Sequence, residues 1–170
     1  MDIFNAVAGW CSILSFLGLG FTLYQVITMK GKTEACLEML SAIKDFEILS
    51  PILKDCLESS NNNLKLAGNI IEEVKKTNSL TPDLQDKIHE LINANDDLRV
   101  KIEAQLPDCG SALSSANDYL RNTLKEERYW ESKIDTAKIR MEKSHKLLIG
   151  KQREITDKKE RVLVQAFGNE

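Results

Sequence analysis

An uncharged stretch from residue 3 to residue 29 constrains this chain more than any other feature of its sequence. Asp2 precedes it, Lys30 follows it, and its only ionisable side chains are those of Cys11 and Tyr24. As a helix, a stretch of this length reaches about 40 Å, whereas the hydrocarbon core of a bilayer is roughly 30 Å thick. Few domains of this size can bury such a helix. The stretch therefore predicts a single membrane-spanning helix.

The flanks of the stretch predict that it is retained and indicate its orientation. A cleaved signal peptide has a basic start and a shorter apolar segment, whereas this chain begins with Asp2 and stays uncharged up to Lys30. Lys30 and Lys32 follow the span, so the positive-inside rule places the rest of the chain in the cytoplasm. We expect a transmembrane anchor at 1–32 and a cytoplasmic helical bundle at 33–170.

One side of the predicted span carries small and polar side chains. At 100° per residue they fall within an arc of about 160°. An unsatisfied polar group in hydrocarbon costs several kcal/mol, so this side favours contact with another helix or with a water-filled lumen. Two interpretations remain open: a packing face between helices, or a ring of identical helices around a pore. The predicted pore-lining or helix-packing residues are Asn5, Ser12, Ser15, Gly18, Thr22 and Gln25.

The rest of the chain predicts an all-α fold. It contains no alternating strand pattern and no Asn-Gly or Asp-Gly hairpin signal. Helix starts are predicted at Ser50-Pro51 and at Thr81-Pro82, where a capping side chain precedes a proline. Apolar residues after the second start recur at alternating spacings of four and three. This stripe consists of Leu84, Ile88, Leu91, Leu98 and Ile102, with Asn95 in the same register.

The turn signals predict how these helices are connected. Pro107 to Gly110 predicts a turn, and from Ser111 the helical pattern runs on for about 38 residues, with Gly150 as its first weak point. Four or five antiparallel helices with short connections give an up-and-down bundle. A coiled-coil seam would show similar stripes, but the proline-marked reversals favour the bundle.

Charge is divided unevenly along the chain. The formal net charge is −3, with 23 Lys+Arg against 26 Asp+Glu. Residues 121–170 hold 13 basic and 9 acidic residues, net +4, so residues 1–120 hold 10 and 17, net −7. A basic last helix is compatible with RNA or anionic lipid as a partner. Interleaved signs, as between Lys125 and Glu131, are also typical of a solvated face.

Motifs for common catalytic and cofactor sites are missing from the sequence. It contains no Walker loop, no H-E-x-x-H and no G-x-S-x-G motif. Its four cysteines lack C-x-x-C spacing and it has only two histidines, so neither a metal site nor a cofactor is predicted. One short pattern is compatible with chemistry, namely Arg140 followed by His145, an R-x4-H spacing. Residues five apart on a helix lie about 140° apart, so Arg140 and His145 do not share a face of one helix.

The R-x4-H spacing resembles the motif of the HEPN ribonuclease superfamily, in which two protomers usually each supply an Arg and a His. In such a site His145 would activate a ribose 2′-hydroxyl and Arg140 would stabilise the charged phosphorane. A chain that combines this motif with an N-terminal span and a helical bundle resembles the membrane accessory proteins of type VI-B CRISPR systems. Met141 follows Arg140 here, where the superfamily usually has a polar residue.

This resemblance implies a ring-shaped homo-oligomer that acts as a pore in the lipid bilayer, here the inner membrane of a bacterium with the bundle in the cytoplasm. It further implies an antiviral role in which the protein depolarises the membrane and strengthens defence by an RNA-guided ribonuclease. The alternative function is a membrane-anchored HEPN-type ribonuclease that acts on RNA, with Arg140 and His145 as its catalytic residues. A third interpretation is a scaffold whose bundle docks a partner protein.

Overall fold

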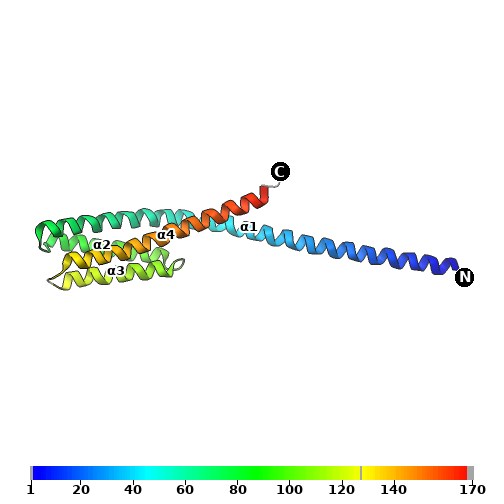
Figure 1. The fold of residues 1–170 in the computed structure, drawn as a ribbon, viewed down its shortest axis with the longest axis horizontal. Helices are drawn as coiled ribbons and strands as arrows, with labels where there is room; N and C mark the ends of the chain where they lie inside the picture. The colour runs from blue at the N-terminus through cyan, green and yellow to red at the C-terminus, as the bar shows by residue number, and fades with distance from the viewer. Residues whose placement is uncertain (1, 127, 168–170) are drawn as a thin grey trace.

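The computed structural model describes the backbone of residues 2–126 and 128–167 and the side chains of residues 19–126 and 128–164. This part of the chain contains four helices and no strand, and Figure 1 shows their order. The all-α prediction is therefore confirmed. The helices are α1 (Asp2–Thr77), α2 (Pro82–Ile102), α3 (Pro107–Lys125) and α4 (Trp130–Phe167).

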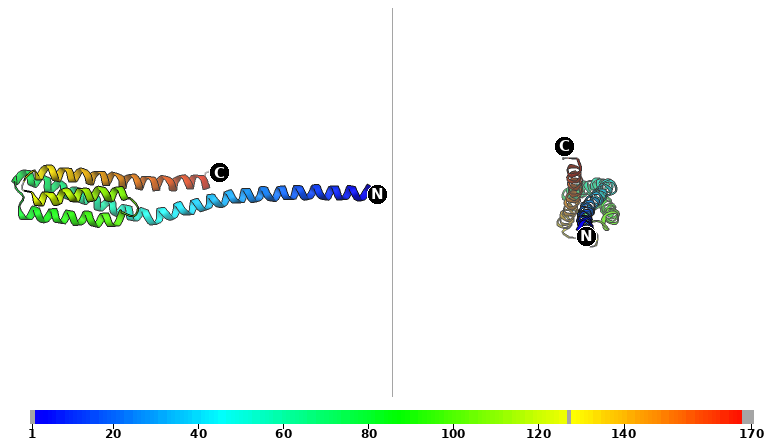
Figure 2. Two further views of the ribbon diagram at one scale, coloured as in Figure 1. Left: turned by 90° about the horizontal axis from the view of Figure 1, so that it is seen from below. Right: turned by 90° about the vertical axis from the view of Figure 1, so that its right-hand side faces the viewer.

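The C-terminal half of α1 packs with the other three helices in an up-and-down bundle (Figures 1 and 2). The contacting pairs are α1 with α2, α2 with α3, α3 with α4, and α4 with α1. This pattern places α1 diagonally opposite α3, and α2 diagonally opposite α4. The predicted helical bundle is confirmed. The N-terminal half of α1 projects from one end of the bundle as a single helix (Figure 1).

Helix α2 starts where the sequence predicts. Thr81 is its N-cap, with φ −67° and ψ 158°, and its hydroxyl accepts a hydrogen bond from the Leu84 backbone N–H at 3.3 Å. Pro82 occupies the first turn, where a missing N–H has no intrahelical acceptor to lose. Asn78 directly follows the last residue of α1 and has a φ of 48°, a left-handed conformation that asparagine tolerates better than most residues.

The predicted helix start at Ser50-Pro51 is wrong, because α1 continues through Pro51. Burial explains the difference. Ala42, Leu53 and Cys56 are buried and Phe46 and Leu49 pack against the core, so one apolar stripe runs across the proline without a change of phase. Packing on both sides of the proline offsets the hydrogen bond that it cannot donate. Figure 2 shows α1 bending where it enters the bundle.

The long helix predicted from Ser111 is also wrong in its extent. Helix α3 begins earlier, at Pro107, so the predicted turn forms its first helical turn, and it ends at Lys125. The chain then reverses before Trp130, and Tyr129 adopts a φ of 63° that is uncommon for a bulky residue. Helix α4 continues through Gly150, the predicted weak point.

The bundle core is built from the predicted stripes. All six stripe positions of α2, including Asn95, are buried. The helical pattern after Ser111 also forms the core. Leu124, Trp130 and His145 in it are partly buried, and its buried residues on α3 and α4 are Leu113, Ala116, Leu120, Ile134, Ala137, Met141 and Leu148. The largest fully buried apolar side chains are Ile70, Leu84, Ile88, Leu91, Leu98, Ile102, Leu113, Leu120, Ile134, Met141 and Leu148.

The predicted boundary between anchor and bundle does not interrupt the secondary structure, since α1 continues across residues 32 and 33. Residues 3–18 of the predicted span lie outside the residues whose side chains are described. In the described part of the chain, no helix contains a segment that is both long and apolar enough to cross a membrane. The transmembrane anchor therefore stays a prediction.

Two core cysteines allow a direct test of the packing. Cys56 and Cys109 are fully buried, and burial raises the pKa of both thiols, whereas Cys36 is exposed. Because the thiolate is the reactive form, we expect a maleimide at pH 7 to label Cys36 rapidly and to spare the two core cysteines. Peptide mass spectrometry measures the labelling, with the urea-unfolded chain as the control. Equal labelling rates at Cys36 and Cys56 in the folded protein would contradict the packing described here.

Candidate membrane and assembly surface

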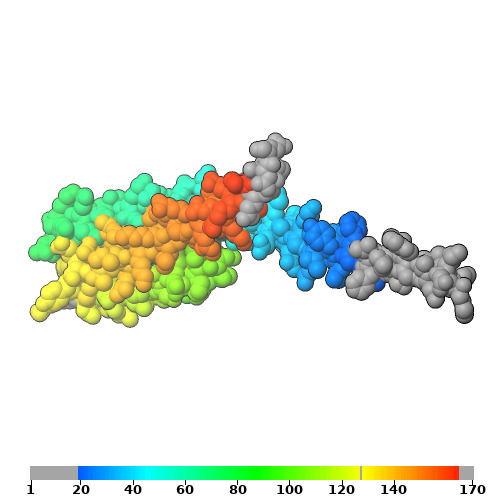
Figure 3. Space-filling model, turned by 45° about the vertical axis from the view of Figure 1, so that its right-hand side comes forward, coloured from blue at the N-terminus to red at the C-terminus, as the bar shows by residue number. Residues whose placement is uncertain are grey.

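The most unusual surface of this molecule is the projecting part of α1. We call residues 19–38 the stalk, because every one of them is exposed (Figure 3). A contiguous apolar surface of this kind marks a membrane or protein contact. The large apolar side chains of the stalk are more than half accessible and comprise Leu19, Phe21, Leu23, Tyr24, Val26, Ile27, Met29 and Leu37.

Apolar side chains surround the first part of the stalk on several sides. Leu23, Tyr24 and Met29 are all exposed and lie about 100° to 140° from one another around the helix axis. A helix that is apolar all round is typical of burial in lipid or in protein, not of a water-facing rod. From Lys30 onward the stalk becomes charged, with Lys32 and Glu34 following within one turn or so.

Hydroxyl groups in the stalk bond to the helix that carries them. Thr28 donates a hydrogen bond to the Tyr24 carbonyl at 2.8 Å, and Thr33 donates one to the Met29 carbonyl at 2.8 Å. A hydroxyl satisfied in this way enters an apolar environment at little cost, because it leaves no unpaired donor. These two threonines are therefore compatible with a lipid or protein contact.

Of the six predicted pore-lining or helix-packing residues, two are described. Thr22 and Gln25 are exposed on the stalk, three residues apart and therefore close to the same side of α1. Asn5, Ser12, Ser15 and Gly18 lie outside the residues whose side chains are described. The predicted polar side of the helix thus stays a prediction.

The C-terminal half of α4 contacts the part of α1 that follows the stalk. We call residues 45–50 of α1 the stalk base. Gln152 donates a hydrogen bond to the Ser50 hydroxyl at 2.8 Å, and the Lys158 ammonium lies 3.4 Å from an Asp45 carboxylate oxygen. The Lys159 ammonium lies 3.7 Å from the centroid of the Phe46 ring. These contacts join α4, the last helix along the chain, to the stalk base. They give α1 a defined direction relative to the bundle.

The structure places Arg140 and His145 against different neighbours. Arg140 is exposed and lines a groove between α3 and α4 together with Ser111 and Ser115. His145 is partly buried, and its Nδ1 lies 3.0 Å from the Ser60 hydroxyl on α1. The structure therefore does not bring the two side chains together within one copy. Their catalytic role stays a prediction.

A buried polar layer crosses the bundle beside His145, and most of it escapes sequence reasoning. The Asn63 side-chain amide donates a hydrogen bond to the side-chain oxygen Oδ1 of Asn95 at 3.1 Å. The Asn95 amide donates one in turn to Oδ1 of Asn117 at 3.0 Å. Asn117 in turn donates to the backbone carbonyl of Ile92 at 3.1 Å. Only Asn95 lies on a predicted stripe. Asn63 is the last of three consecutive asparagines on α1, and neither it nor Asn117 on α3 carries a sequence signal that the two helices meet there. The fully paired layer aligns three helices in one register.

A second polar contact lies deeper in the core. The Cys109 thiol is 2.7 Å from the Ser144 hydroxyl, and both side chains are fully buried. No group of three or more His, Cys, Asp or Glu side chains suited to a metal ion occurs in the part of the chain that the structure describes.

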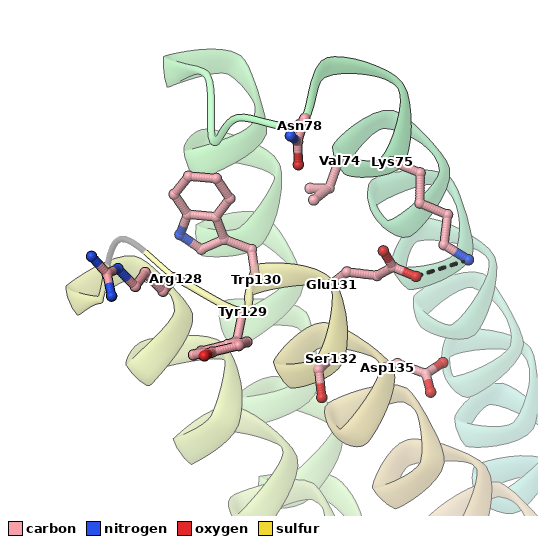
Figure 4. A pocket seen from close by; sticks show the side chains of 9 residues that line it. All are labelled: Val74, Lys75, Asn78, Arg128, Tyr129, Trp130, Glu131, Ser132 and Asp135. Carbon is pink, nitrogen blue, oxygen red and sulfur yellow. Dashed lines mark ion pairs between the residues drawn. The ribbon is translucent and has the colours of Figure 1, made fainter.

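The far end of the bundle carries an open hollow of about 830 Å³ between the α1–α2 and α3–α4 connections (Figure 4). The Lys75 ammonium and a Glu131 carboxylate oxygen, 3.1 Å apart, form an ion pair at its edge. Tyr129 and Trp130 line it from the second connection, and the Trp130 indole donates to the Glu126 carbonyl at 2.8 Å. Its charges are of both signs, so it favours no one class of ligand.

Comparison with protein-family models, with curated proteins and with solved structures finds no match to this chain.

Proposed function

We propose that this protein is a membrane-anchored antiviral effector that oligomerises through α1 into a pore and depolarises the inner membrane. One observation carries the proposal: the last part of the uncharged stretch over 3–29 forms the apolar first part of the stalk, which the bundle leaves exposed. The bundle has its own closed core, so the stalk is not needed to complete it. Lipid and neighbouring copies are the surroundings in which such a helix is stable.

The described contacts support the coupling of bundle and membrane. Helix α1 runs without interruption from the stalk into the bundle core, and α4 fastens the stalk base through Ser50 and Asp45. A change in how the bundles pack would therefore tilt or rotate the spans. Such a coupling suits a gated assembly. The link to an RNA-guided ribonuclease rests on the resemblance alone.

A pair of substitutions tests whether the polar side of the span lines a lumen. Ser15→Leu together with Thr22→Leu is expected to leave ring assembly intact and to abolish the loss of membrane potential, because leucines would make the lumen apolar and dewet it. A voltage-sensitive dye in induced cells measures the potential, and particle images of the detergent-extracted protein measure assembly. The matched control is Phe21→Leu with Tyr24→Leu on the opposite side, which should keep full depolarisation. If depolarisation persists in the first variant, the lumen assignment is wrong.

The alternative of an anchored HEPN-type ribonuclease makes a different prediction. Since Arg140 and His145 face different helices of one bundle, it requires two copies that combine an arginine of one with a histidine of the other. Cleavage of RNA by the full chain, lost in both Arg140→Ala and His145→Ala, would favour it over the pore. A closed ring without cleavage would favour the pore.

A further inference from the structure

The middle of α4 concentrates positive charge on the outside of the bundle. Between residues 138 and 153 the sequence holds six Lys or Arg residues and a single acidic residue, Glu142. Four of the basic side chains are exposed, and we call them the basic stripe: Arg140, Lys143, Lys146 and Arg153.

None of these four side chains forms an ion pair in the part of the chain that the structure describes, whereas seven other basic residues of the bundle do. Lys87 pairs with both Glu73 and Asp83, and Arg121 pairs with Asp96 at 2.9 Å. No carboxylate of the described residues lies within 4.0 Å of any basic-stripe nitrogen. The positive charge of the basic stripe is therefore not compensated by a directly paired carboxylate, and it is concentrated on one segment of α4.

The geometry of the basic stripe fits an extended anion. Lys143, Lys146 and Arg153 fall within an arc of about 80° on α4. From Arg140 to Arg153 the helix rises about 20 Å. Arg140 and Lys143 also line the groove of about 320 Å³ against α3, with Ser111 and Ser115 as hydrogen-bonding neighbours and Asp108 at the same groove. A row of charges of this length matches a phosphodiester backbone better than a single small anion.

The distance of the basic stripe from Lys30, measured along α1, argues against a lipid surface as its binding partner. Gln152 is level with Ser50 and His145 is level with Ser60, as their hydrogen bonds show. These levels lie about 30 Å and 45 Å along α1 from Lys30, where the predicted span ends. Charges are screened beyond roughly 8–10 Å in physiological salt. With α1 anchored as proposed, the basic stripe is beyond the reach of the headgroups.

We propose that the basic stripe binds the phosphate backbone of a nucleic acid. No Phe, Tyr or Trp occurs between residues 131 and 166, so the part of α4 that carries the basic stripe offers no aromatic side chain on which bases would stack. The contact is therefore made to phosphates, is independent of nucleotide sequence and weakens steeply with salt. This site lies outside the predicted span, so binding and depolarisation can each fail without the other.

Fluorescence anisotropy of the full chain in neutral detergent tests the proposal. The probes are a labelled 20-base-pair RNA duplex and a single strand of the same length. Four phosphate contacts to a duplex give a slope of log affinity against log salt near −3.6, which is about a 150-fold loss from 50 mM to 200 mM salt. The triple variant Lys143→Glu, Lys146→Glu and Arg153→Glu should weaken binding at 50 mM salt at least about tenfold, since three contacts become repulsive.

A control variant of equal charge separates a local contact from overall charge. Lys44, Lys76 and Lys125 are exposed residues away from the middle of α4, and their replacement by Glu should weaken binding less than about threefold. Equal losses in both variants, or no binding at 50 mM salt, would overturn the proposal. It would also be overturned if the stripe variant kept RNA binding but lost flotation with anionic vesicles. Should the Glu variant fail to fold, the corresponding Gln variant, which removes charge without reversing it, is expected to lose binding too.

Discussion

Asn95→Ala is expected to lower the free energy of unfolding by about 3 kcal/mol. Asn95 is fully buried and bonds on both sides, so its removal leaves the Asn63 amide without its acceptor and the Asn117 carbonyl oxygen without its donor. Each unsatisfied buried group costs about 1–3 kcal/mol. Urea unfolding of the full chain in detergent, followed by circular dichroism, measures the change. A loss below about 1 kcal/mol would show that water satisfies the two orphaned groups.

Replacing all three asparagines tests whether the cost comes from unpaired groups. Asn63→Leu, Asn95→Leu and Asn117→Leu together remove every side-chain partner of the layer and keep similar volume. This variant should recover most of the stability lost in Asn95→Ala, because no side-chain donor or acceptor is left unpaired. If it is as unstable as the single variant, packing and not hydrogen bonding sets the cost.

Pro51→Ala is expected to stabilise the bundle by about 2 kcal/mol. Proline in a helix interior removes one backbone hydrogen bond and crowds the carbonyl one turn before it, here that of Glu47. Alanine restores the N–H and fits the same helix. The midpoint and slope of urea unfolding measure the gain, and the slope should not change.

The control for this prediction is Pro82→Ala. Pro82 lies in the first turn of α2, where its missing N–H costs nothing, so the expected change is below about 0.5 kcal/mol. Destabilisation by Pro51→Ala would mean that the bend near the stalk base is needed for α4 to reach Ser50 and Asp45. That outcome would tie the direction of the stalk to the proline.

Much of the bundle can be predicted from its sequence, because local signals and packing agree there. Thr81 caps α2 and Pro82 follows it, so both the start of the helix and its buried stripe match the pattern. Pro51 shows where local signals fail. Ser50-Pro51 is the same kind of helix-start signal as Thr81-Pro82. The apolar stripe from Ala42 to Cys56 nevertheless keeps its phase across the proline and holds the helix together.

The reversal between α3 and α4 is missed for the opposite reason. No glycine or proline lies between Lys125 and Trp130, and Tyr129 adopts the left-handed conformation without a residue type that signals it. The chain turns there because α4 must return along α1 and α3 to close the core, a demand that is absent from local sequence. The predicted pair of Arg140 and His145 shows the same limit, since spacing alone cannot tell that His145 lies against Ser60.

The sequence by itself determined the all-helical class, the apolar stripes and the uncharged stretch over 3–29, since each follows from the order of side chains along one helix. Tertiary structure decided what those helices expose and pair. It left the stalk uncovered, brought Asn63, Asn95 and Asn117 into one layer, and kept the charges of Lys143 and Lys146 unpaired. These outcomes depend on contacts between residues far apart in the chain, which no local pattern encodes.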